Sequence, residues 1–203
     1  MAESDERSAI TIGRILDAAR ALFAARGYPE VTTDEIARAA RVTKGGLYHH
    51  FPSKQRVYVA MLLADLEAKR RLFAAAVASH GTCRERLARL TGAFLALPED
   101  ESAMLRLVRR DVNFFQGEDR TRLVRAYQRA LPEQVEAIVR DGMAEGELAP
   151  GNPRLVSWAF VGLVQVMIGD YAVRELGEGE ARLEYVLRLF FEGAVALPAG
   201  VGR

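Results

Sequence analysis

The residues whose types and spacing could do chemistry gather in residues 32–51, in the stretch TTDEIARAARVTKGGLYHHF. Its second half places an ammonium group, a phenol and two imidazoles on neighbouring positions: Lys44, Tyr48, His49 and His50. Such groups hydrogen-bond to phosphates and to the edges of bases. The stretch therefore predicts a surface that binds nucleic acid.

Two short helices are needed to position these side chains. Thr32 followed by Glu35 fits a capping box, in which the hydroxyl and the carboxylate each satisfy a backbone N–H at a helix start. Thr43 is a second N-cap candidate, so the residues that follow it fall on one short helix. This order of helix, turn and helix is typical of a DNA-binding motif whose second helix enters a major groove.

Positive charge is concentrated in the segment that carries this motif. Residues 7–56 contain nine Lys or Arg against four Asp or Glu, whereas the whole chain of 203 residues has a net charge of +1. Residues 57–203 hold 19 basic and 20 acidic residues. A basic surface without a partner would show the same bias. The charge distribution therefore supports the DNA-binding motif but is not sufficient evidence by itself.

Enzymatic and metal sites find little support in the sequence. The histidines are His49, His50 and His80, and the pair His80 and Cys83 lacks the two further ligands that a structural zinc site needs nearby. There is no glycine-rich phosphate loop and no G-x-S-x-G nucleophile elbow. We therefore expect a protein that is not an enzyme and that holds no metal or cofactor. The alternative to DNA binding is a helical module that binds another protein, against which the basic segment and the paired N-caps argue.

The composition predicts a globular protein of the cytoplasm. Hydrophobic residues make up 50% of the chain and charged residues 27%, which excludes a largely disordered chain. The single cysteine, Cys83, cannot form an intrachain disulfide. The N-terminus MAESDERSA lacks the pattern of a signal peptide, and no apolar run is long enough to span a membrane. We expect no membrane association.

Helical signals dominate the chain, which predicts an all-α fold of about nine helices. Apolar residues recur at helical spacing before Gly27 and again after Lys54. Asn152 followed by Pro153 combines an N-cap with proline at the first helical position. After the motif, the predicted helices are residues 54–79, 83–97, 99–115, 119–145, 153–176 and 178–197.

The motif and its flanks resemble the TetR family of bacterial transcriptional regulators. Besides the motif itself, the resemblance rests on ILDAARALFAARGYPEVTTDEIARAA upstream and YHHFPSKQRVYVAML downstream, together roughly the first third of the chain. It implies an N-terminal three-helix DNA-binding head with a helix-turn-helix in residues 1–56. It also implies a C-terminal antiparallel helical domain for ligand binding and dimerisation in residues 57–203.

The resemblance and the side-chain chemistry together predict which residues contact DNA. Thr43 and Lys44 begin the recognition helix, where Lys44 can reach a guanine or a phosphate. Tyr48, His49 and Lys54 resemble phosphate-contacting positions of the family. The full predicted set is Thr32, Thr33, Thr43, Lys44, Gly45, Gly46, Tyr48, His49, His50 and Lys54.

Two residues depart from the family pattern. Arg41 lies where the turn commonly has glycine, so either a left-handed backbone there costs about 1 kcal/mol or the turn differs slightly. Gly46 lies where a hydroxyl or methyl side chain is common, which removes one possible base contact. The resemblance therefore does not define the operator sequence.

The segment LVSWAFVGLVQVMIGDY is apolar on nearly every side of its helix. Such a helix must be buried on more than one face, either inside one core or between a core and a second subunit. The resemblance implies a homodimer through the last two helices, which form a four-helix bundle with their symmetry mates. A dimer presents two recognition helices to half-sites about 34–36 Å apart on a near-palindromic operator. A monomeric bundle with a very apolar core is the alternative.

The resemblance also implies a small-molecule effector held in the second domain. Arg106, Arg109 and Arg110 share a helix face and could hold the anionic head of an acyl-CoA-like ligand, although pairing with Asp111 or other acids also explains them. We expect a repressor released by a largely apolar ligand. The candidate ligand-binding residues are Leu62, Leu66, Met104, Leu107, Val108, Arg109, Phe114, Phe115, Tyr127, Trp158, Val161, Met167 and Tyr171.

Overall fold

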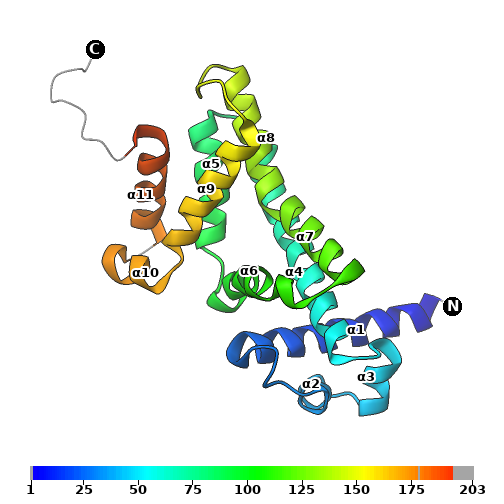
Figure 1. Cartoon of the computed structure of the whole chain (residues 1–203). Coiled ribbons are helices and arrows are strands. Elements are labelled where there is room, and N and C mark those ends of the chain that lie inside the picture. Colours follow the sequence, from blue (N-terminus) through cyan, green and yellow to red (C-terminus); the bar gives the residue numbers. More distant parts are fainter. Residues whose placement is uncertain (1, 178, 194–203) are drawn as a thin grey trace, which may run out of the picture. The chain divides into compact units, whose positions relative to one another are not determined.

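A computed structural model describes residues 2–177 and 179–193, and every regular element in these residues is a helix (Figure 1). The all-α prediction is confirmed. The described residues form eleven α-helices and one 3-10 turn, more than the predicted nine. The elements are α1 Ala2–Arg26, α2 Thr33–Ala39, α3 Lys44–His50, α4 Lys54–Val77, α5 Cys83–Leu95, α6 Glu99–Asp111, η1 Val112–Phe114, α7 Gly117–Ala130, α8 Pro132–Ala144, α9 Pro153–Met167, α10 Asp170–Leu176 and α11 Gly179–Glu192.

Three predicted helices are shorter or broken. The prediction of one helix over residues 119–145 is wrong, because Pro132 cannot continue a helix and instead begins α8 at its first turn. The helix predicted over residues 153–176 is interrupted at Ile168 and Gly169, after which α10 starts. The helix predicted over residues 99–115 ends at Asp111 and gives way to η1. Residues 178 and 194–197 of the last predicted helix lie outside the described residues.

The chain forms two compact units, each built from two stretches of sequence. The first, here called the reading unit, contains residues 2–69 and Pro98–Gln128; the second, here called the bundle unit, contains Arg70–Leu97 together with residues 129–177 and 179–193. Helix α4 contributes its first part to the reading unit and its last part to the bundle unit. The functional boundary predicted at residue 56 stays a prediction.

The core of the reading unit begins with the apolar face of α1. Ile15, Ala19 and Phe23 are fully buried there, as are Ile36 of α2 and Leu47 of α3. Burying such side chains contributes about 1.5–3 kcal/mol each, which holds three helices together although two of them have only seven residues.

Helix α6 joins this unit through a polar contact between Asp111 and Tyr58, whose ring also packs against an aromatic residue of α1. Tyr58 of α4 is fully buried and its hydroxyl donates to Asp111 at 2.5 Å, while Arg110 also donates to that carboxylate. Burial and then the bond to Asp111 raise the pKa of the Tyr58 hydroxyl. The Tyr58 ring packs edge-on against Phe23, with ring centroids 4.7 Å apart. Residues of α1, α4 and α6 therefore share one interior.

In the bundle unit, α8 packs along α9, and α11 packs against both α5 and α9. Predicted N-caps are confirmed here as well: the Asn152 side chain accepts from the first backbone N–H groups of α9.

Among the described residues no single helix is both long and apolar enough to cross a membrane, and only the bent pair α9 and α10 passes such a test jointly.

Candidate nucleic-acid interface

Helix α3, the predicted recognition helix, begins at a well-formed cap. Thr43 has extended backbone angles and its hydroxyl accepts from the N–H of Gly46 at 3.0 Å. Leu47 anchors the helix in the core. A Cβ at position 46 would lie 3.1 Å from the Thr43 hydroxyl oxygen, so glycine suits the tight first turn. The predicted N-cap is confirmed.

The outer face of α3 carries exposed groups that can bind DNA. Thr43, Lys44, Gly45, Tyr48 and His49 are all exposed. The Tyr48 hydroxyl shares a 3.0 Å hydrogen bond with the Thr33 hydroxyl of α2, which joins two of the predicted residues across the turn. His50 is half-buried, and its ring lies edge-on to His49 with centroids 5.0 Å apart. The structure thus brings most of the predicted DNA-contacting residues onto one surface.

Lys44 already has an anionic partner in this surface. Its Nζ lies 2.8 Å from Asp34 Oδ1, and both side chains are largely exposed. The hydrogen bond to Asp34 raises the pKa of Lys44, so the ammonium stays charged at neutral pH. An exposed ion pair of this kind contributes little to stability, because water and salt screen it. A phosphate or a guanine can therefore compete with Asp34 for Lys44.

Thr32 is used to start α2. Its hydroxyl accepts from the Glu35 N–H at 3.2 Å, and the Glu35 carboxylate accepts in return from the Thr32 N–H at 2.8 Å. The predicted capping box is confirmed. Arg26 donates to the same carboxylate at 2.9 Å, and this bond, followed by those from Thr32, lowers the pKa of Glu35 to about 2.

Lys54, at the start of α4, connects this helix to the loop between α1 and α2. Its Nζ donates to the carbonyl oxygens of Tyr28 at 2.9 Å and Val31 at 3.0 Å, and it lies 4.4 Å from the centre of the Tyr28 ring. These contacts hold the loop that leads from α1 to α2. The phosphate contact predicted for Lys54 stays a prediction, and the structure shows a supporting role that spacing alone did not reveal.

In the turn between α2 and α3, the structure shows the left-handed backbone at Arg41, the first of the two alternatives given above. Arg41 has φ of 55°, the only positive φ of a residue other than glycine in the described part of the chain. Its carbonyl accepts from Arg14 of α1 at 3.1 Å. The left-handed conformation lets the chain reverse direction within the few residues that separate the helices.

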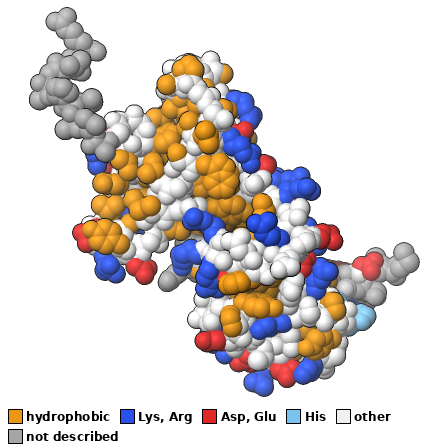
Figure 2. All heavy atoms as spheres, viewed as in Figure 1, with side chains coloured by type: hydrophobic (Ala, Val, Ile, Leu, Met, Phe, Trp, Pro, Cys, Tyr) orange, Lys and Arg blue, Asp and Glu red, His pale blue; other side chains and the backbone are white. Residues whose placement is uncertain are grey.

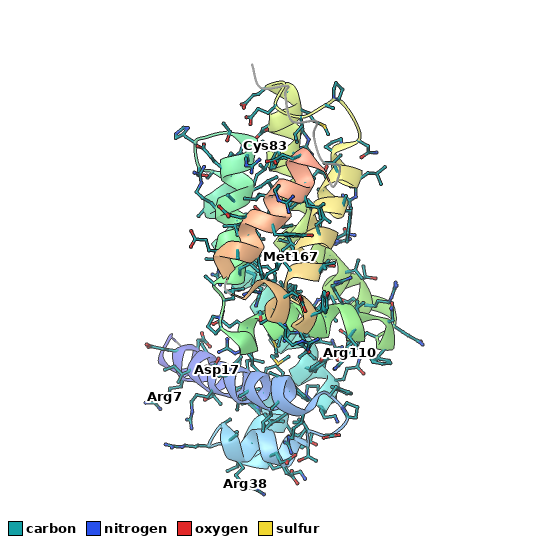
Figure 3. The ribbon with its side chains drawn as sticks, turned by 90° about the vertical axis from the view of Figure 1, so that its left-hand side faces the viewer. Arg7, Asp17, Arg38, Cys83, Arg110 and Met167 are labelled. Atoms are coloured by element: carbon teal, nitrogen blue, oxygen red, sulfur yellow. The ribbon has the colours of Figure 1, made fainter. Side chains whose placement is uncertain are left out.

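One cation near this surface was missed by the sequence analysis. Arg38 is exposed on α2 and has no ion pair among the described residues (Figure 3). The available signal was its position one turn after Asp34, on the outward side of a helix whose inward side is Ile36 and Ala37.

The predicted ligand-binding residues divide between the two units and between the interior and the surface. Buried in the reading unit are Leu62, Leu66, Met104, Leu107, Val108, Phe115 and Tyr127. Val161 and Met167 are buried in the bundle unit. Phe114 and Tyr171 are 77% and 69% exposed, Trp158 is partly exposed, and Arg109 is exposed, so these four do not belong to the interior of either unit. Their roles as ligand contacts stay predictions.

Residues 15–61 match the bacterial regulatory proteins of the tetR family, and residues 80–169 match the tetracyclin repressor-like C-terminal domain. The chain belongs to the TetR family. The matched TetR-family proteins are regulators of transcription, which confirms the prediction of a DNA-binding regulator that is not an enzyme.

Individual TetR-family proteins show likeness in sequence or in fold. TtgW of Pseudomonas putida, an uncharacterized HTH-type transcriptional regulator, is 51% identical over 49 residues, or 24% of this chain and 37% of that protein. The match thus spans little more than a third of that relative. FadR of Bacillus subtilis, in complex with stearoyl-CoA, superposes with a TM-score of 0.77 at 19% identity over 90% of this chain and 98% of that one. AibR, in complex with isovaleryl coenzyme A and operator DNA, superposes with a TM-score of 0.70 at 22% identity over 89% and 98%. At these identities the structural matches show the fold.

Proposed function

We propose that this TetR-family protein is a ligand-responsive repressor that binds a near-palindromic operator in the cytoplasm. The observation that carries the proposal is the exposed polar face of α3. The Thr43 cap fixes the start of this helix, and buried Leu47 anchors its inner face in the core. Because the cap satisfies the first turn and Leu47 is buried in the core, Lys44, Tyr48 and His49 are presented on an anchored helix. Preformed donors of this kind suit the major groove.

The proposed repressor acts as a homodimer through α9 and α11. One face of α9 is buried through Phe160 and Val164, yet Leu155 and Val166 on the other side are 68% and 61% exposed. Trp158 lies on that outer face too, and Figure 2 shows apolar side chains gathered over this region. Large exposed apolar patches are typical of interfaces. A second copy packed there would cover them and pair the two recognition helices.

The proposed effector is a largely apolar molecule with an anionic head, such as an acyl-CoA. Arg110 is already committed to Asp111, as the pairing explanation predicts, whereas Arg106 and Arg109 are exposed and make no ion pair within the described residues. These two cations could meet phosphates, and the apolar side chains of α4 and α6 could meet an acyl chain. That FadR and AibR were crystallised with acyl-CoA molecules supports this class of ligand.

A titration of fluorescent DNA from the region upstream of its own gene tests the regulator and its effector separately. We expect site-preferring binding that weakens when stearoyl-CoA is added and that coenzyme A alone does not affect. Lys44→Ala should reduce the preference for the site over unrelated DNA, while Arg174→Ala, an exposed cation on α10, serves as the matched control. Absence of any sequence preference at moderate salt would remove the repressor proposal. If stearoyl-CoA leaves DNA binding unchanged, only the proposed class of ligand is refuted, and the proposed DNA-binding role stays.

A further inference from the structure

A small groove begins at the C-terminal end of the recognition helix and extends beyond the helix-turn-helix to α4 and α7. It has a volume of about 160 Å³ and is lined by His50, Phe51, Pro52, Arg56, Val59, Ala60, Leu63 and Arg122. Its floor is apolar, and its polar groups are one imidazole and two guanidiniums. All of these residues belong to the reading unit. This surface is called the flanking groove below.

Helix α7 is fastened to the first turn of α4, which places Arg122 at the groove. The buried carboxylate of Asp119 accepts from Gln55 at 2.9 Å through one oxygen and from Arg56 at 3.0 Å through the other. Arg122 follows Asp119 by three residues and so lies on the same side of α7. The position of Arg122 relative to α3 and α4 is therefore set by two hydrogen bonds.

The groove retains unused hydrogen-bonding capacity for an anion. Arg122 makes no ion pair within the described part of the chain, and Arg56 uses only Nη1 toward Asp119 there. A guanidinium has five N–H donors in a planar fork, so Arg56 keeps donors after this pairing. The Asp119 charge is satisfied by its two partners and is buried. The polar groups of the groove that face solvent are therefore predominantly cationic.

The size and location of the groove favour a phosphate group over the proposed effector. Pockets for drug-sized ligands have volumes of about 300–1,000 Å³, larger than this groove. It adjoins the recognition helix, and phosphates flank the bases that such a helix reads. About half or more of protein–DNA hydrogen bonds go to the phosphate and sugar backbone.

We propose that the flanking groove binds a phosphate of the DNA backbone next to the operator half-site, with Arg122 and Arg56 as donors. The inference rests on the proposed function, since it needs a protein that binds DNA. It extends the DNA-contacting surface from the helix-turn-helix to α7, far along the chain. Because a phosphate contact carries no sequence information, the groove adds affinity and sets orientation without altering which bases are read.

The test is the salt dependence of operator binding by the full-length protein. Each lost phosphate contact lowers the slope of log affinity against log salt concentration by about 0.9. Arg122→Ala should therefore bind more weakly at 50 mM salt. When the salt rises from 50 to 200 mM, the affinity of the variant should fall by a factor that is roughly threefold smaller, per protomer, than the factor for the unchanged protein. Discrimination between operator and unrelated DNA should stay the same, and Arg122→Lys should recover most of the slope.

Arg120→Ala is the matched control, because Arg120 is also exposed on α7 and unpaired among the described residues but does not line the groove. Equal slopes for the Arg120 and Arg122 variants would overturn the inference while leaving the regulator intact. Loss of discrimination in Arg122→Ala, with normal thermal unfolding, would also overturn it, because the residue would then read bases. If the unchanged protein shows no sequence-preferring binding, the proposed function fails first.

Discussion

Replacing Arg41 by glycine should stabilise this protein. Arg41 has φ of 55°, a conformation in which the Cβ of an L-residue crowds the following carbonyl. The substitution removes that Cβ and little else, since the Arg41 side chain is exposed and makes no ion pair in the described structure. The tertiary contact at this position is the bond from Arg14 to the Arg41 carbonyl, which glycine keeps.

The expected gain follows from two opposing effects. A left-handed conformation costs a residue other than glycine about 1–2 kcal/mol. Glycine avoids this cost but adds about 0.5–1 kcal/mol of conformational entropy to the unfolded chain. The difference predicts an increase of about 0.5–1 kcal/mol in the free energy of unfolding. For a protein of this size the melting temperature should rise by about 2–3 °C.

The free energy of unfolding is measured by urea denaturation without DNA, and Arg41→Ala is the control. Alanine removes the same charge and the same long side chain but retains a Cβ, so its stability should stay within about 0.5 kcal/mol of the unchanged protein. If alanine and glycine stabilise equally, the gain comes from losing a cation and the backbone argument is refuted. A glycine variant less stable than the unchanged protein refutes it as well.

Three further predictions concern a structural cation, a carboxylate and the apolar face of α9. Lys54→Met should lower the free energy of unfolding by about 2 kcal/mol, because the carbonyls of the α1–α2 loop lose a charged donor; a stable variant with weaker DNA binding would show that Lys54 acts on phosphate instead. The folded-state pKa of Glu35, about 2, lies below the ordinary 4.5, so its contribution to stability is complete above pH 4.5 and is lost as the pH falls toward 2. Glu35→Gln should therefore flatten the loss of stability between pH 5 and pH 3 in urea titrations, relative to the control Glu30→Gln, and an unchanged acid profile would contradict the assigned bonds. Leu155→Glu should dissociate the proposed dimer in sedimentation velocity and weaken operator binding, whereas Ile10→Glu, at a similarly exposed apolar position on α1, should do neither.

The helices and caps of the DNA-binding motif were predictable from the sequence because their signals are local. The capping box at Thr32 and Glu35 and the N-cap at Thr43 involve groups three residues apart, and the structure contains both. The break at Pro132 has an equally local signal, although the helical pattern on both sides of it predicts one continuous helix. For Arg41 the family resemblance left two alternatives, a left-handed backbone or a different turn, and the structure shows the first.

The candidate site was less predictable where a side chain has a choice of partners. Lys44 and Lys54 look alike in the sequence, each near a helix start. In the structure one forms an exposed pair with Asp34, while the other donates to carbonyls more than 20 residues earlier in the chain. Spacing cannot distinguish these outcomes, because which partner is within about 3 Å depends on how the helices pack.

The sequence by itself therefore determined the all-helical fold, the two helices of the motif and the family to which the chain belongs. Backbone hydrogen bonds within four residues and capping groups within three are enough for the helices, and the residues of the motif and its flanks are enough for the family. Only the tertiary structure decided that Lys54 supports the α1–α2 loop and that Asp119 holds Arg122 beside the recognition helix. Those contacts join residues more than 20 and more than 60 positions apart, and they exist only once apolar burial has brought the helices together.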